Sequence, residues 1–229
     1  MMTKIRHYNA YISWLYRLIV LTVIPVAVAL LFLLLAGNGG EVGVMTCLLM
    51  LPAALLLLFL IADRLIIGPV YETGHTEADF LKSSERGRQV FADVMKMDVC
   101  LRLVIYSAVF VIGAILLGVS GRHAGYLEQI WCAVLVDIVA LHAATQVGLL
   151  IIRRIQNPNL YVLFIYVAEL LLLPAFAAVV VGSVPVAMSV GVLYLAADVA
   201  ATVGNTNIVK KMTAGKWYSD VQNGRSVAE

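Results

Sequence analysis

Charged residues are scarce in this chain. Asp, Glu, Lys and Arg make up 13% of its 229 residues, whereas soluble domains carry about 25%. Hydrophobic residues account for 62%, and the mean hydropathy is +0.95. This balance leaves too little polar surface for a water-soluble domain of this size. We therefore expect an all-α, polytopic integral membrane protein.

The motifs of common catalytic and metal sites are also missing. The sequence has no GxxxxGK[ST] phosphate loop, no HExxH pair and no nucleophile elbow. Cys47, Cys100 and Cys132 stand singly in apolar segments, and the histidines do not have the spacing of a ligand set. We expect no enzyme activity, no metal site and no haem or other cofactor. The aromatic residues after the first basic residues are unlike a cleavage site, so we expect no removable signal peptide.

Six apolar segments reach the length of about 20 residues that a helix needs to cross the hydrocarbon core. Turn-forming residues separate them, such as Gly37-Asn38-Gly39-Gly40 and the Gly182-Ser183 pair before Pro185. The sequence therefore predicts a six-helix transmembrane domain over residues 18–209. The predicted spans are Leu18–Ala36, Val44–Ile67, Val99–Val119, Ile130–Ile152, Leu160–Val181 and Val184–Thr206.

The basic residues are unevenly divided between the two sides of this predicted bundle. With both termini on one side, that side carries all of the 16 Lys and Arg residues except Arg122. Short loops rich in Lys and Arg remain in the cytoplasm. We therefore expect both termini, residues 71–98 and the tail at 210–229 to be cytoplasmic.

Residues 1–17 have the pattern of an interfacial amphipathic helix. Ile5, Tyr8, Ile12 and Leu15 recur at helical spacing, and further aromatic residues suit the headgroup layer. The alternative is a long first span whose aromatic residues form its interfacial belt.

Residues 71–98 are the main charged segment between two predicted spans. Gly68-Pro69 is expected to end the second span. Thr76 begins a short helix with acidic residues in its first turn, and Ser83-Ser84 can cap a further helix that continues into the third span. Val90, Phe91, Val94 and Met95 fall on one side of that helix. We expect a helix–turn–helix along the membrane, either as a solvated connector or as a docking element for a soluble partner.

This arrangement resembles the export-type (type 2) permease subunits of ATP-binding-cassette transporters. Glu72-x-Gly74, Phe80-Leu81 and Ser83-Ser84 are similar to the Glu, Gly, Leu and Ser spacing of that family's coupling helix. The resemblance implies a bacterial cytoplasmic membrane, a separate cytoplasmic ATPase and a second permease subunit, with no nucleic acid partner. The docking residues that it implies are Glu72, Thr76, Asp79, Phe80, Leu81, Arg86 and Arg88.

Three carboxylates, Asp137, Glu169 and Asp198, fall within predicted spans. Charged groups in the membrane usually face a cavity or the interior of the bundle. The tight turn between the last two spans could bring Glu169 and Asp198 together, and His142 and Gln146 follow Asp137 on roughly the same side. These five residues form either a polar path or structural hydrogen bonds.

Three functions remain open at this point. The first is a permease-like subunit of an ATP-driven export complex, coupled through residues 71–98. The second is an ion- or proton-coupled carrier that uses the intramembrane carboxylates. The third is an accessory subunit of a larger membrane complex that does not itself transport.

Overall fold

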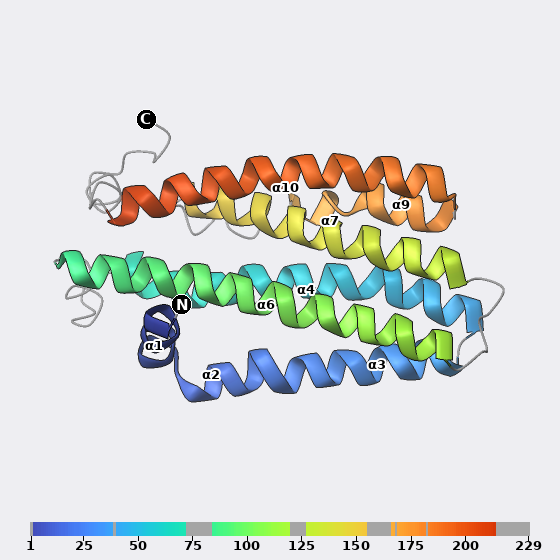
Figure 1. The fold of residues 1–229 in the computed structure, drawn as a ribbon, viewed down its shortest axis with the longest axis horizontal. Coiled ribbons are helices and arrows are strands. Elements are labelled where there is room, and N and C mark those ends of the chain that lie inside the picture. Colours follow the sequence, from blue (N-terminus) through green and yellow to red (C-terminus); the bar gives the residue numbers. More distant parts are fainter. Residues whose placement is uncertain are drawn as a thin grey trace.

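The computed structural model describes residues 2–38, 40–71, 84–119, 127–154, 166–167, 169–181 and 183–213. Within these ranges the regular structure is entirely helical, and the long helices run side by side (Figure 1). The all-α class is therefore confirmed. Five helical segments are long and apolar enough to cross a membrane, as expected for an integral membrane protein.

The first of these segments, Trp14–Leu34, is built from α2 (Trp14–Leu18), a π-helical turn η1 (Ile19–Val23) and α3 (Ile24–Asn38). The next three are formed by α4 (Gly40–Tyr71), α6 (Glu85–Val119) and α7 (Leu127–Arg154). The last belongs to α10 (Val184–Thr213), which packs closely along α7.

The predicted fifth span, residues 160–181, is described only from 166 onward and without residue 168. Its regular part is the short helix α9 (Leu173–Val181), which packs against α4, α7 and α10. Five candidate spans are therefore established, and a sixth is not.

Of the two helix boundaries beside the charged segment, the end of α4 differs from the prediction, whereas the start of α6 agrees with the predicted helix that continues into the third span. Helix α4 continues past Pro69 to Tyr71, so Gly68-Pro69 does not end it. Proline is tolerated in membrane helices when neighbouring groups satisfy the freed carbonyl. Helix α6 begins at Glu85 and runs without interruption to Val119. Residues 85–98 therefore extend the third span instead of lying across it (Figure 1).

The beginning of α6 matches its predicted cap and buried side. The Ser84 hydroxyl accepts a hydrogen bond of 2.9 Å from the Gly87 N–H, which satisfies one free donor of the first turn. Phe91, Val94 and Met95 are buried, as their spacing predicts.

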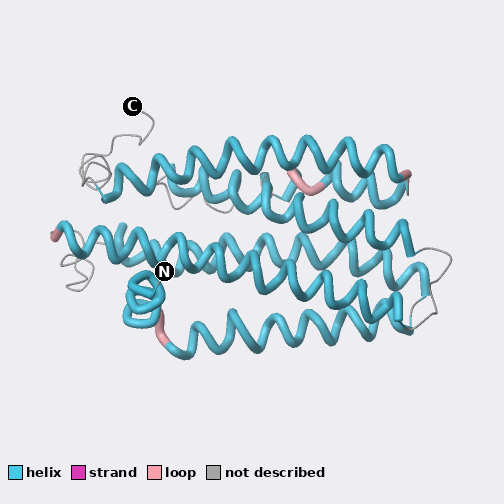
Figure 2. Tube along the Cα trace, viewed as in Figure 1, coloured by secondary structure: helices cyan, strands magenta, loops and turns pink. Residues whose placement is uncertain are grey.

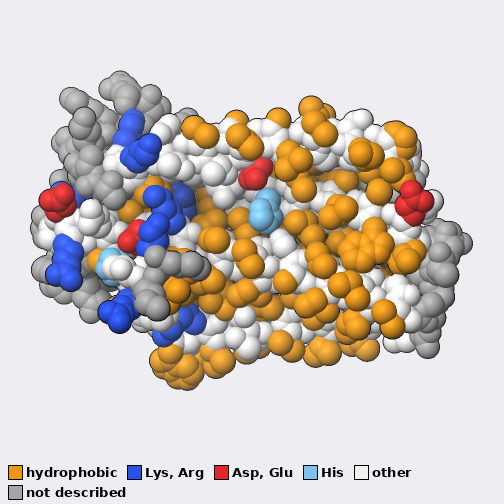
Figure 3. Space-filling view, in the orientation of Figure 1, with side chains coloured by type: hydrophobic (Ala, Val, Ile, Leu, Met, Phe, Trp, Pro, Cys, Tyr) orange, Lys and Arg blue, Asp and Glu red, His pale blue; other side chains and the backbone are white. Residues whose placement is uncertain are grey.

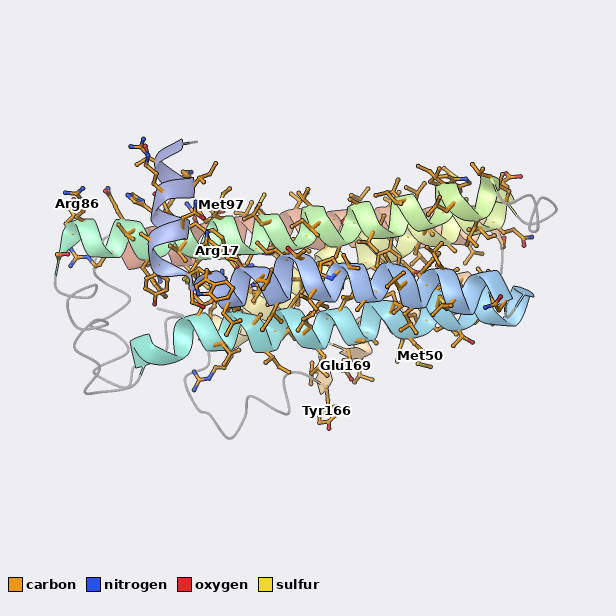
Figure 4. The ribbon with its side chains drawn as sticks, turned by 90° about the horizontal axis from the view of Figure 1, so that it is seen from below. Arg17, Met50, Arg86, Met97, Tyr166 and Glu169 are labelled. Atoms are coloured by element: carbon orange, nitrogen blue, oxygen red, sulfur yellow. The ribbon has the colours of Figure 1, made fainter. Side chains whose placement is uncertain are left out.

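Helix α1 (Met2–Tyr11) lies across the other helices and packs on α6 (Figures 1 and 4). It is shorter than predicted, because the chain bends at Ile12-Ser13 and Ser13 caps α2. The predicted apolar stripe is therefore divided. Tyr8 and Ile12 are buried, whereas Leu15 is about half exposed on α2.

A tyrosine supplies a hydrogen bond that the irregular first span lacks. In η1 the Ile24 N–H bonds to the Ile19 carbonyl, one residue further back than in an α-helix, and Pro25 follows with no N–H. The Val20 carbonyl accepts a hydrogen bond of 2.9 Å from the Tyr106 hydroxyl of α6 instead. A carbonyl that would otherwise lack a partner in lipid is thereby satisfied.

One end of the bundle, which we call the basic end, holds α1, the start of α6, and Lys210 and Lys211 of α10. Lys and Arg side chains gather there, while the middle of the visible face is largely apolar (Figure 3). The far end holds the α9–α10 connection (Figure 1).

Asp98 and Arg102 form a buried ion pair near the basic end. Arg102 Nη2 lies 2.7 Å from Asp98 Oδ2 within α6. The Tyr8 hydroxyl donates to Asp98 Oδ1 at 3.0 Å, and the Tyr16 hydroxyl donates to Oδ2 at 3.3 Å. Burial, followed by the charge of Asp98, raises the pKa of Tyr8, so this hydroxyl keeps its proton. The pair therefore fastens α1 and α2 to α6.

Arg102 also contacts α4, and a second buried ion pair joins α4 to α7. Arg102 Nη1 donates to the Phe59 carbonyl at 2.6 Å, and its guanidinium lies over the Phe59 ring. Asp63 of α4 pairs with Arg153 of α7, with 2.7 Å between Oδ1 and Nη2. All four charged side chains are buried.

Removing one member of the Asp63–Arg153 pair should destabilise the protein more than removing both. Asp63→Leu leaves a buried guanidinium without this carboxylate, which costs about 3–5 kcal/mol, whereas Asp63→Leu/Arg153→Leu removes both charges. In thermal unfolding followed by size-exclusion chromatography in detergent, the double variant should melt above Asp63→Leu. Equal melting temperatures would contradict this.

Candidate functional site

A groove runs between α6, α7 and α10 on the basic half of the bundle. Both apolar and polar side chains from these three helices line it. The lining residues are Met95, Lys96, Val99, Cys100, Leu103, Val104, His142, Gln146, Arg153, Asp198, Thr202, Asn205, Thr206 and Val209.

His142 and Asp198 line the part of this groove that is farther from the basic end. They come from α7 and α10 and lie close enough to interact electrostatically. His142 Nε2 is also 3.1 Å from the Ser107 hydroxyl of α6. In Figure 3 a histidine and an acidic side chain lie next to each other halfway along the apolar face. An imidazole beside a carboxylate can hold a polar ligand or exchange a proton.

Gln146 and Asn205 form the next polar layer toward the basic end. The Asn205 amide donates to the Gln146 backbone carbonyl at 2.8 Å and to Gln146 Oε1 at 2.9 Å. This contact joins α7 to α10 through two hydrogen bonds. Among the described residues, Asn205 Oδ1 and Asp198 Oδ1 have no hydrogen-bond partner. Two buried acceptor oxygens beside the groove are therefore unsatisfied by the described residues.

Asp137 is placed apart from the groove. Its side chain is 1% exposed, and neither carboxylate oxygen has a hydrogen-bond partner among the described residues. Holding a charge there would cost about 3 kcal/mol or more. His142 and Gln146, which the sequence groups with Asp137, face the groove instead.

Glu169 is not among the residues that line the groove. It is half-buried in the short helical stretch before α9, in the same region as Tyr166, which points away from the bundle in Figure 4. The structure thus gives Asp198 a partner in His142 rather than in Glu169. Sequence reasoning places the two acids at similar depth but cannot fix which way each faces.

The implied docking residues are only partly described. Arg86 is exposed and Arg88 is half-buried in the first turns of α6, at the basic end. Glu72, Thr76, Asp79, Phe80 and Leu81 lie outside the described residues.

Sequence reasoning missed the buried ion pairs. Asp98 and Arg102 are spaced i,i+4 where the apolar part of α6 begins, which is a usable signal for a pair on one helix face. Asp63 lies inside the predicted second span, so it should have been grouped with the other intramembrane acids. Its partner Arg153 comes from a distant part of the chain, and no local pattern identifies it.

The described residues contain no group of three or more His, Cys, Asp or Glu side chains that could hold a metal ion. Comparison of the chain with protein-family models, curated proteins and solved structures gave no match.

The native cysteines can report whether water enters the groove. Cys100 is exposed and lines the groove, whereas Cys47 is buried. Thiol reagents attack the thiolate, which forms in contact with water. A charged methanethiosulfonate reagent added to open membrane fragments should modify Cys100 but not Cys47, as measured by mass spectrometry. Cys100→Ser is the control, and an unmodified Cys100 would show that the groove is not water-filled.

Proposed function

We propose that this protein is a membrane transport component whose substrate path is the groove between α6, α7 and α10. The observation that carries the proposal is the meeting of His142, Asp198, Gln146 and Asn205 in an opening on the side of the bundle. Polar residues within the membrane are costly and commonly mark substrate or ion paths.

The chemistry of the groove favours a small amphipathic substrate. The carboxylate of Asp198 and the side-chain amides of Gln146 and Asn205 line the groove, and their oxygens are acceptors suited to a cationic or hydrogen-bond-donating head. Val99, Leu103, Val104 and Val209 offer apolar surface for the rest of the molecule. Since the groove lies between helices rather than along the axis of the bundle, such a molecule can enter sideways from the bilayer.

In an ATP-driven version of this proposal, the protein is the permease-like subunit of an export complex, and a separate ATPase supplies the energy. The supporting observation is the extension of α6 beyond its apolar part at the basic end, where Arg86 is exposed. In this version residues 71–98 dock an ATP-binding-cassette ATPase, and a second permease completes the path. The basic end is then cytoplasmic, in agreement with the positive-inside rule.

Substrate binding in the groove should depend on Asp198. Rhodamine 6G, a lipophilic cationic dye, serves as the probe in fluorescence polarisation measurements on the protein in lipid nanodiscs. Loss of a charge-assisted contact costs about 1.5–3 kcal/mol, so Asp198→Asn should weaken binding by roughly tenfold or more. Glu128→Gln is the matched control, because Glu128 is an exposed acid in the first turn of α7. Equal affinities of Asp198→Asn and the wild type would remove the groove as the binding site.

Photocrosslinking tests whether a separate ATPase supplies the energy. A photoreactive amino acid at position 86 in native membranes should capture an ATP-binding-cassette ATPase, identified by mass spectrometry, if the ATP-driven version holds. The same group at position 116, where Leu116 is exposed on the apolar face, should not. Dye transport by the purified protein in liposomes without an ATPase would contradict the ATP-driven version.

A further inference from the structure

The helical segment that contains α9 is interrupted inside the bundle. Leu171 and Leu172 form a turn, and regular helix resumes at Leu173 (Figure 2). Pro174 explains the break, because its nitrogen has no hydrogen to donate to the Leu170 carbonyl and its ring crowds that carbonyl. Non-helical backbone at membrane depth persists only where protein or water satisfies its polar groups.

Tyr194 of α10 satisfies two of those groups. In a continuous helix the Ala175 N–H would bond to the Leu171 carbonyl. Here the Tyr194 hydroxyl stands between them, because it accepts from the Ala175 N–H at 3.3 Å and donates to the Leu171 carbonyl. The break is thus held by a side chain inserted into the helical hydrogen-bond ladder.

Asp137 of α7 lies within electrostatic range of this inserted tyrosine. Both Asp137 oxygens lack hydrogen-bond partners among the described residues, and the side chain is 1% exposed. A buried titratable group and a hydroxyl-bridged helix break therefore belong to the same packed set of helices, α7, α9 and α10.

Openings approach Asp137 from both ends of the bundle. On the far side, an apolar pocket between α4, α7, α9 and α10 has Gln129 and Ser183 among its lining residues and includes Ala133 and Val136, within one turn of Asp137. On the other side, the groove reaches His142, five residues further along α7. Along α7, Asp137 therefore lies between residues that line the pocket and residues that line the groove, and it lines neither opening itself.

We propose that Asp137 is a proton-binding site between these two openings. A proton delivered by hydronium forms an O–H bond with one carboxylate oxygen, water leaves, and the buried group becomes neutral. Release to water on the other side reverses this step. A proton needs a single carboxylate oxygen, whereas hard metal ions take about six or more oxygen ligands, and the described residues hold no metal-binding group of three.

Other charged groups on the packed helices have partners elsewhere. Asp198 of α10 faces His142, Asp63 of α4 pairs with Arg153, and Asp98 of α6 pairs with Arg102. Just before the break, Glu169 is half-buried and its backbone carbonyl accepts a hydrogen bond from the Leu172 N–H, whereas residues 170–175 are apolar. Tyr194 is the bridging group that interacts electrostatically with Asp137. Asp137 therefore acts on the break through Tyr194, because a neutral Asp137 changes the field at the bridging hydroxyl.

Infrared spectroscopy of the protein in lipid films tests this assignment. A protonated carboxyl group has its own C=O stretching band, so a pH titration should show such a band falling as pH rises. The band should be lost in Asp137→Asn and retained in Asp198→Asn, which removes the groove carboxylate. Asp137→Glu should restore a shifted band, and size-exclusion chromatography verifies that each variant remains folded.

Several results would overturn the proposal. A pH-dependent band that persists in Asp137→Asn assigns it to another group. A band from Asp137 that is constant at all pH values means that its proton is never released. A band that disappears on addition of Na⁺ at constant pH identifies a metal cation as the ligand. Coupling of this proton to transport rests on the proposed function, but the titration needs no substrate, so dye binding can fail while the Asp137 band remains.

Discussion

The bilayer core holds no water that could bond to free backbone N–H and C=O groups. Wherever a membrane helix is irregular, the protein itself must therefore supply a partner for these groups. Two tyrosines meet this requirement. Tyr106 donates to the Val20 carbonyl beside the π-helical turn, and Tyr194 bridges Leu171 and Ala175 at the break before α9. In both places a proline follows in the chain and a hydroxyl comes from a neighbouring helix. The helices are therefore held in register by these contacts as well as by apolar packing.

The same constraint governs the buried charges at the basic end. The attraction within a buried ion pair roughly offsets its desolvation, so Asp98–Arg102 and Asp63–Arg153 add little net stability. They do restrict how the helices can meet, because a shifted register would leave a charge unpaired. Asp98 accepts from two tyrosines of the N-terminal segment, and Arg102 reaches a carbonyl of α4. One pair thus sets the positions of α1, α2 and α4 relative to α6.

Five of the six predicted spans coincide with long apolar helices because apolar length is a strong signal, and the cap at Ser84 follows from a local rule. Features that depend on neighbours were not predictable. Pro69 is a helix breaker by propensity, yet α4 continues through it. Of the intramembrane polar residues, His142 and Asp198 meet in the groove, while Asp137 lies in the core. Depth follows from counting along a helix, but orientation depends on packing between segments far apart in the chain, which a single sequence does not encode locally.

The Tyr194 hydroxyl inserted between Leu171 and Ala175 replaces a direct backbone hydrogen bond of a regular helix with a bridge from a neighbouring helix. A direct N–H to carbonyl bond fixes the distance between successive turns, whereas a bridging hydroxyl sits on a ring that can shift with α10. The segment before the break and α9 can then tilt against each other while both backbone groups keep a partner. The tyrosine thereby keeps both backbone groups of the break hydrogen-bonded without a direct bond between them.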